Sequence, residues 1–127
     1  MEKKWNGKVK EFYYDNILLF EGEYLNGEIN GKGKEYYNNG DLLFEGEYLN
    51  GKRNGKGKEY YNDNGKLLFE GEYLNGERNG KGKEYYDNGE LRFEGEYLYD
   101  EKRKGKLYIN NKLEYDGEYL YGKKMEW

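Results

Sequence analysis

Seven residue types are absent from the 127-residue chain, namely Ala, Ser, Thr, Pro, Cys, His and Gln. Without Ser, Thr or Cys the protein lacks the usual hydroxyl and thiol nucleophiles, and without His it lacks an imidazole base or metal ligand. The absence of Cys also excludes disulfides and thiolate metal sites. We therefore expect a non-enzymatic protein with no catalytic residues, no cofactor and no metal site.

Long apolar runs are absent as well, so no segment is predicted to span a membrane. The first residues, Met1 to Trp5, lead into strand-like sequence without the apolar region of a signal peptide. The net charge is −4 and no segment is strongly basic, which argues against a nucleic-acid partner. We expect a cytoplasmic or peripheral membrane location and no small-molecule substrate.

The residues that are present favour a folded chain. Charged residues make up 38% of the sequence, a composition that often indicates disorder when hydropathy is low. However, the chain also contains 17 tyrosines and 20 glycines, and 19% of its residues are aromatic. Because tyrosine buries a large ring while its hydroxyl stays hydrated, a thin sheet can be stabilised without a thick core.

An internal repeat organises the sequence. Phe20, Phe44, Phe69 and Phe93 each begin a copy, at spacings of 24, 25 and 24 residues. In the second copy, period-two alternation predicts strands from Leu42 to Leu49 and from Lys56 to Tyr61.

The reversal between the two strands is predicted from Asn-Gly pairs. Asn50-Gly51 and Asn54-Gly55 both tolerate the positive φ angles that a tight turn needs. No window has a helical period, so the predicted fold is all-β, an elongated single twisted antiparallel sheet of consecutive β-hairpins.

The whole chain, 1–127, is predicted to be one repeat domain with atypical ends. Trp5 and Trp127 add apolar bulk at the two ends, as the terminal units of a repeat array require. The predicted units are an N-terminal half repeat and cap at 1–19, full repeats at 20–43, 44–68 and 69–92, a degenerate repeat at 93–114 and a C-terminal partial repeat and cap at 115–127.

Alternation of side chains predicts two different faces. On one face the glycines between the aromatic residues leave room for the rings. This aromatic repeat face packs within the protein, pairs with a second subunit, or binds a carbohydrate or hydrophobic peptide. On the other face, Glu45 and Glu47 are predicted to lie near Lys56 and Lys58. The aromatic repeat face comprises Phe20, Tyr24, Phe44, Tyr48, Phe69, Tyr73, Phe93 and Tyr97.

The polar residues admit three more specific interpretations. The Glu-Gly-Glu pairs resemble the paired carboxylates of glycosidases, but they recur in every copy, which favours a solvated charge ladder. The turn 62–65 offers oxygen ligands for Ca²⁺ but lacks EF-hand spacing. The loop cations are possible contacts for anionic lipid headgroups, although neighbouring glutamates weaken their field. These cations are Lys52, Arg53, Lys102, Arg103 and Lys104.

The repeat Phe-Glu-Gly-Glu-Tyr-Leu-Asn-Gly-Lys-Arg-Asn-Gly-Lys-Gly-Lys resembles the MORN repeat (membrane occupation and recognition nexus). The match is good over 20–99 and partial over 5–19 and 115–124. The Tyr-Tyr-Asn-Asn-Gly-x-Leu-Leu segment is similar to the bacterial variant of the repeat, which has a longer connector. The resemblance implies a non-enzymatic array of β-hairpins.

The function implied by the resemblance is a scaffold for protein–protein interaction, with self-association as one form and a protein partner or homodimer as the expected partner. The alternatives are a peripheral membrane module that binds an anionic membrane surface, and a recently duplicated or engineered repeat cassette or antitoxin-like protein without independent activity.

Overall fold

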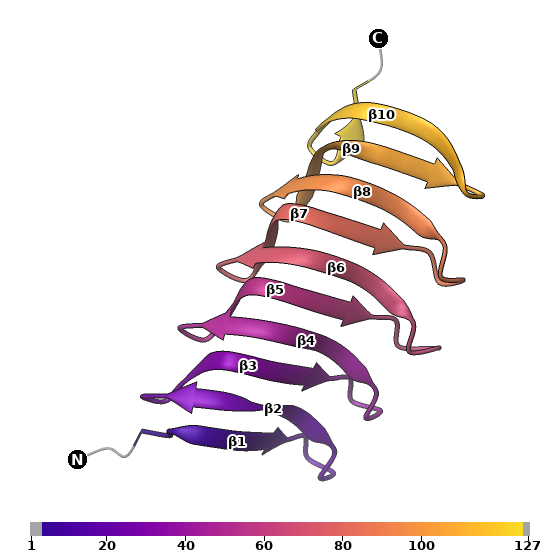
Figure 1. Cartoon of the computed structure of the whole chain (residues 1–127). Helices are drawn as coiled ribbons and strands as arrows, with labels where there is room; N and C mark the ends of the chain where they lie inside the picture. Colours follow the sequence, from indigo (N-terminus) through magenta and orange to yellow (C-terminus); the bar gives the residue numbers. More distant parts are fainter. Residues whose placement is uncertain (1–3, 126–127) are drawn as a thin grey trace.

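The computed structural model describes residues 4–125, which form one open antiparallel sheet. Its eleven strands follow one another in sequence order from β1 to β11, so each strand pairs only with its neighbours in the chain (Figure 1). No helix occurs in the described range. The prediction of an all-β array of consecutive hairpins is confirmed.

The strands alternate between two sequence types. The even-numbered strands carry the Glu-Gly-Glu type of sequence. The odd-numbered strands from β1 to β9 carry the Lys-Gly-Lys type, with Val9 in place of the glycine in β1. The even strands are β2 (Leu18–Leu25), β4 (Leu42–Leu49), β6 (Leu67–Leu74), β8 (Leu91–Leu98) and β10 (Lys112–Leu120). The odd strands are β1 (Gly7–Phe12), β3 (Glu28–Tyr36), β5 (Lys52–Tyr60), β7 (Glu77–Tyr85), β9 (Glu101–Ile109) and the short β11 (Lys123–Lys124).

The hairpin between β4 and β5 is tighter than predicted. Asn50 and Gly51 alone close it, with φ angles of 51° and 83°, as a two-residue hairpin turn with positive φ at both positions requires. The prediction that Asn54-Gly55 belongs to the reversal is wrong, because β5 already begins at Lys52. Gly55, with φ of 105°, lies inside the strand, near the register shift between Gly46 and Tyr48.

Tyrosine hydroxyls connect successive repeats at the opposite ends of the hairpins. The Tyr37 hydroxyl donates to the Tyr60 carbonyl at 2.7 Å, and the Tyr61 hydroxyl donates to the Tyr85 carbonyl at 2.6 Å. Each bond spans one full repeat and satisfies a backbone carbonyl. The connecting turns are therefore tied to the next repeat as well as to their own strands.

The core is one row of aromatic rings rather than a layer between two sheets. All eight residues of the aromatic repeat face are buried, and Phe44, Phe69 and Phe93 are fully buried. Neighbouring rings meet edge to face, as in Phe44 and Tyr73, whose centroids are 5.2 Å apart. Trp5 continues the row by packing edge-on against Tyr24 at 5.5 Å. The C-terminal cap predicted at Trp127 lies outside the described residues.

Candidate functional site

The aromatic side of the sheet is closed by its own residues. A Cβ atom added to Gly46 would lie 2.9 Å from the Phe44 ring and 2.6 Å from the Gly57 Cα atom. Since real Cβ atoms do not approach so closely, the Phe44 ring rests directly on the backbone. The sequence left open whether this face is core or ligand surface, and the packing places it in the core.

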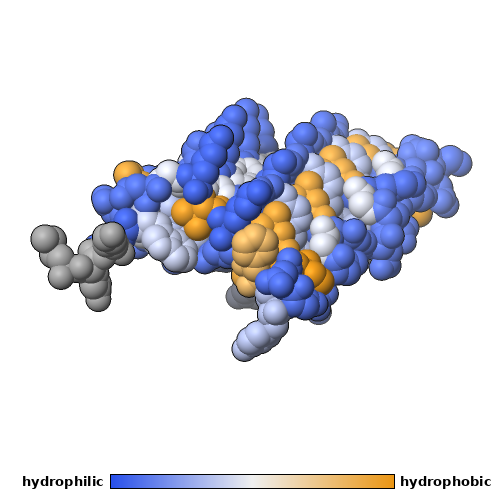
Figure 2. Space-filling view, turned by 90° about the horizontal axis from the view of Figure 1, so that it is seen from below, coloured by the Kyte–Doolittle hydropathy of each residue, from blue (hydrophilic) through white to orange (hydrophobic). Residues whose placement is uncertain are grey.

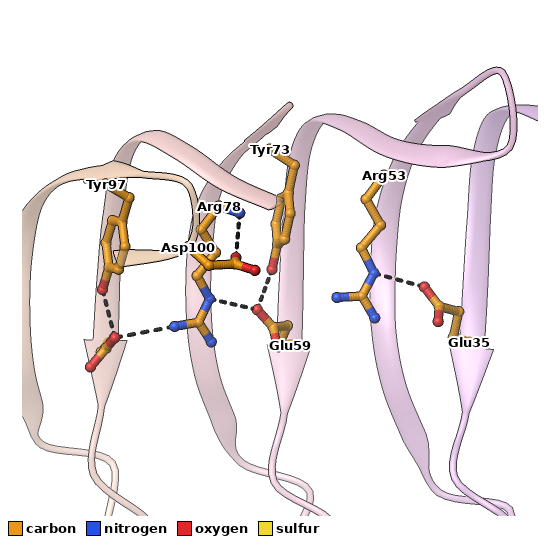
Figure 3. A network of polar contacts seen from close by, with 8 residues as sticks. Glu35, Arg53, Glu59, Tyr73, Arg78, Tyr97 and Asp100 are labelled. Carbon is orange, nitrogen blue, oxygen red and sulfur yellow. Dashed lines mark hydrogen bonds and ion pairs between the residues drawn. The ribbon is translucent and has the colours of Figure 1, made fainter. Parts of the chain in front are cut away.

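A cation covers the aromatic row in the second repeat, and Figure 3 shows its contact with Glu35. The Arg53 guanidinium lies 3.9 Å above the Phe44 ring centroid, and its Nε donates to Glu35 Oε2 at 2.8 Å. The Tyr48 hydroxyl donates to the same carboxylate oxygen. Burial, followed by the Glu35 carboxylate, raises the pKa of Tyr48. The arrangement satisfies the polar groups at the edge of the core.

The same arrangement recurs in the next repeat and is extended there. Arg78 Nε donates to Glu59 Oε2 at 2.9 Å, and its Nη1 donates to Glu84 Oε1 at 3.2 Å. The Tyr97 hydroxyl also donates to Glu84, at 2.7 Å. Lys102 completes the chain of contacts at 3.4 Å from Glu84. Figure 3 shows Arg78 and Tyr73 directed toward Glu59 of β5.

The opposite side of the sheet contains an open groove of about 1810 Å³ that extends from β1 to β10. Its floor is a row of glycine backbones, in which Val9 of β1 replaces the glycine. Its two walls are rows of charged side chains that change sign at every strand. One wall consists of Lys10, Glu21, Lys34, Glu45, Lys58, Glu70, Lys83, Glu94, Lys106 and Asp116, and the other of Lys8, Glu23, Lys32, Glu47, Lys56, Glu72, Lys81, Glu96, Lys104 and Glu118. We call these side chains the groove walls. Figure 2 shows hydrophilic side chains in bands along the molecule, with an apolar stripe beside them.

The seven groove-wall carboxylates from Glu21 to Glu94 accept hydrogen bonds from the sheet itself. Glu45 accepts a hydrogen bond from the Tyr60 hydroxyl at 2.9 Å, and Glu47 accepts one from the Lys56 backbone N–H at 2.7 Å. Burial and the Glu45 carboxylate raise the pKa of Tyr60 to about 12. The register also places Glu45 opposite Lys58, as the sequence predicted.

The lysines of the groove walls are held much less firmly. All ten are exposed. Within residues 4–125, the one ion pair shorter than 4.0 Å that involves them joins Lys104 to Glu96 at 3.5 Å. The groove therefore presents fixed carboxylates and solvent-facing ammonium groups in alternate bands.

The five candidate lipid contacts do not lie together. Arg53 and Lys102 point to the aromatic side, where they pair with Glu35 and Glu84. Lys104 is a groove-wall residue. The remaining two, Lys52 and Arg103, are exposed. The structure thus divides this set between two faces, and anionic lipid binding by these residues stays a prediction.

The turn 62–65 is held by hydrogen bonds of its own. Asn64 Nδ2 donates to the Asp87 carbonyl at 2.8 Å, and Asn64 Oδ1 accepts from the Lys66 N–H at 2.9 Å. Over residues 4–125, no cluster of three acidic side chains is arranged to hold a metal ion. In the same range, no helix is long and apolar enough to cross a membrane.

Sequence reasoning missed the structural role of the cations over the aromatic row, since it named Arg53 and Lys102 only as lipid contacts and did not name Arg78. Four equivalent positions in successive odd strands each pair with a buried tyrosine of the preceding strand. Ile29 occupies the first of them, and the cations Arg53, Arg78 and Lys102 occupy the other three. Aligning the copies on this position would have revealed a long side chain in every repeat. The available signal was the spacing of these four residues, 24 or 25 positions apart.

Comparison with known families agrees with this geometry. The MORN repeat model matches residues 20–42, 44–66 and 69–90, and the MORN repeat variant model matches residues 5–26. A search of curated proteins found no match. MORN repeats are generally non-enzymatic modules that interact with proteins or membranes. The repeat model alone matches more than half of the chain, which therefore belongs to the MORN repeat family.

Proposed function

We propose that this protein is a non-enzymatic scaffold that binds another protein through the groove walls. The observation that carries the proposal is the contrast between the two faces. The aromatic side is filled by its own rings and cations, whereas the groove is open along ten strands and presents exposed ammonium groups. A continuous surface of this kind suits an extended partner.

The charge pattern favours a protein partner over an anionic membrane. The groove walls contain ten lysines and ten acidic residues, so their formal charge sums to zero. A surface that attracts anionic lipid normally carries a cluster of positive charges. Alternating bands instead favour a partner whose own charges alternate at a similar spacing.

The test compares a groove variant with a matched control in affinity capture. The groove variant carries Lys32→Glu, Lys56→Glu and Lys81→Glu. The control carries Lys52→Glu, Lys66→Glu and Lys112→Glu, which make the same charge change next to the turns. We expect a partner that is retained by the wild-type protein and by the control and is lost from the groove variant. Equal capture by all three proteins would contradict the proposal.

Co-sedimentation with vesicles tests the membrane alternative directly. We expect no binding to vesicles that contain anionic lipid, because the groove has no net charge. Salt-sensitive binding to anionic vesicles, lost in a variant with Lys52→Glu, Arg103→Glu and Lys104→Glu, would identify a membrane module instead.

A further inference from the structure

The groove walls are complementary to themselves. Every odd strand from β1 to β9 contributes two lysines, and every even strand from β2 to β10 contributes two acidic residues. The sign of the charge thus depends only on whether the strand number is odd or even. A second copy of the chain has the same strand spacing and the same alternation.

Two-fold symmetry selects one way to bring two such faces together. When two copies face each other with their arrays antiparallel, β1 of one copy lies opposite β10 of the other, and β5 lies opposite β6. The two strand numbers of every such pair add up to eleven. One strand of every such pair is odd and the other is even, so each lysine band meets an acidic band. When the arrays are parallel, each band meets its own equivalent and like charges oppose.

We propose that two copies of this chain form an antiparallel dimer through their groove walls. The inference rests on the proposed binding role of the groove and names its partner. The two-fold axis passes between β5 and β6, so that Lys56 and Lys58 of one copy lie opposite Glu70 and Glu72 of the other.

The state of the side chains within one copy supports this pairing. Glu70 accepts a hydrogen bond from the Tyr85 hydroxyl at 2.7 Å, and Glu72 accepts one from the Lys81 N–H at 2.8 Å. The carboxylates are therefore positioned before a partner arrives. The ammonium groups of Lys56 and Lys58 are exposed and, within residues 4–125, form no ion pair shorter than 4.0 Å. A second copy supplies the missing partners for both lysines.

The size of the face indicates a weak dimer. Ten strands at a spacing of about 4.8 Å, and a strip about 12 Å wide, give a footprint of about 500 Å² per copy. The total of about 1,000 Å² is at the lower limit of specific interfaces. Since the contacts are ionic, association should weaken as the screening length falls from about 10 Å at 0.1 M salt to about 3 Å at 1 M salt.

The first experiment is sedimentation equilibrium of the full chain over a series of protein and salt concentrations. We expect reversible dimers at low salt and monomers at about 1 M NaCl, with at least a tenfold weaker association. A protein that is monomeric at every concentration at low salt, or a dimer that is insensitive to salt, would overturn the inference.

A charge-swap pair then tests the geometry. The variant Lys56→Glu, Lys58→Glu and the variant Glu70→Lys, Glu72→Lys should each be monomeric at low salt, because like charges then meet at the dimer centre. An equimolar mixture should form heterodimers, since acidic β5 and β6 of one copy face basic β5 and β6 of the other. Circular dichroism of each variant verifies the sheet before mixing.

The possible results separate this inference from the proposed function. Monomers in the mixture, although both variants are folded, would exclude the antiparallel pairing. The wild-type protein could stay monomeric and still capture a different protein that the groove variant does not capture. That result would overturn the dimer and leave the scaffold proposal standing. A monomer that binds anionic vesicles would contradict both.

Discussion

The two faces of the sheet carry charged residues of the same kinds, but hold them differently. On the aromatic side, Glu35 is shared by Arg53 and Tyr48, and the guanidinium covers a fully buried ring. On the groove side, Lys56 and Lys58 are exposed, while the acidic residues near them are held by hydrogen bonds from the sheet. One face therefore fixes the fold, and the other presents exposed ammonium groups beside carboxylates that the sheet holds in place.

The largest expected difference between the faces follows removal of an apolar side chain. Phe44→Ala removes a fully buried ring and should lower the free energy of unfolding by about 3–5 kcal/mol. Leu49→Ala, five residues later on the groove side, removes a side chain that is 47% exposed and should cost less than about 1 kcal/mol. Urea denaturation of both variants measures the contrast. Equal losses would show that the groove side also belongs to the core.

The cost of changing side-chain size in the glycine row should differ between the middle of the array and its first strand. A Cβ atom on Gly57 would lie 2.5 Å from the Phe44 ring, so Gly57→Val should cost about 3 kcal/mol or more. Val9 already occupies the equivalent position in β1, where it faces Gly22. Val9→Gly should cost about 1–2 kcal/mol, because it removes a partly buried side chain packed against the aromatic core and leaves a glycine inside a strand. Thermal unfolding measures both variants, and a tolerated valine at Gly57 would contradict the close packing.

The sequence predicted which aromatic residues share one face, because that depends on alternation alone, but it left open whether the face is core. Phe44, Gly46 and Tyr48 are separated by two positions, so they share a face in any straight strand. The position of Arg53 over the ring depends in addition on the irregularity near Gly55, where the pairing shifts by two residues between the pairs Gly46–Gly57 and Tyr48–Arg53. A bulge of this kind is a three-dimensional adjustment that strict alternation does not encode.

The alternating groove charges were also evident in the sequence, because Glu-Gly-Glu and Lys-Gly-Lys segments recur in order. The sequence did not reveal which of these charged groups already form hydrogen bonds or ion pairs within the sheet. Lys56 uses its backbone N–H to hold Glu47, and its ammonium remains exposed. This division of roles within one residue depends on atomic geometry and not on residue type, so the open groove emerged only from the structure.

Alkaline pH should weaken the protein through tyrosines on both faces. Burial and nearby carboxylates raise the pKa of Tyr36, Tyr60 and Tyr85 from 10.0 to about 12, and raise the pKa of Tyr48 further. A raised pKa means that the folded state retains the phenol proton more strongly than the unfolded chain does. This stabilisation is complete below pH about 10 and is lost as the pH rises through about 12.

Urea denaturation across this pH range measures the effect. We expect a steady loss of stability above pH about 10, accompanied by tyrosinate absorbance as the protein unfolds. The double variant Tyr60→Phe, Tyr85→Phe should lose less stability between pH about 10 and 12 than the wild-type protein loses. Identical pH profiles for the two proteins would contradict a contribution from the groove-side tyrosines.

The smallest and most selective effects should come from removing single hydroxyl groups. Tyr48→Phe removes a partly buried hydrogen bond to a carboxylate and should cost about 1.5–3 kcal/mol. Tyr60→Phe removes a bond to Glu45 on the groove side and should cost less than about 1 kcal/mol. It should also weaken the dimer, because Glu45 is no longer held in place.

The tyrosine of the last repeat provides the internal control for this comparison. Tyr119 is buried in the same aromatic row, but Leu107 occupies the place of the glutamate, and the Tyr119 hydroxyl has no hydrogen-bond partner in the described range. Tyr119→Phe should therefore be neutral or stabilising, because it removes a buried polar group without a partner. Thermal unfolding of Tyr48→Phe, Tyr60→Phe and Tyr119→Phe ranks the three positions. If Tyr119→Phe cost as much as Tyr48→Phe, the ring rather than the carboxylate bond would account for the stability of the aromatic side.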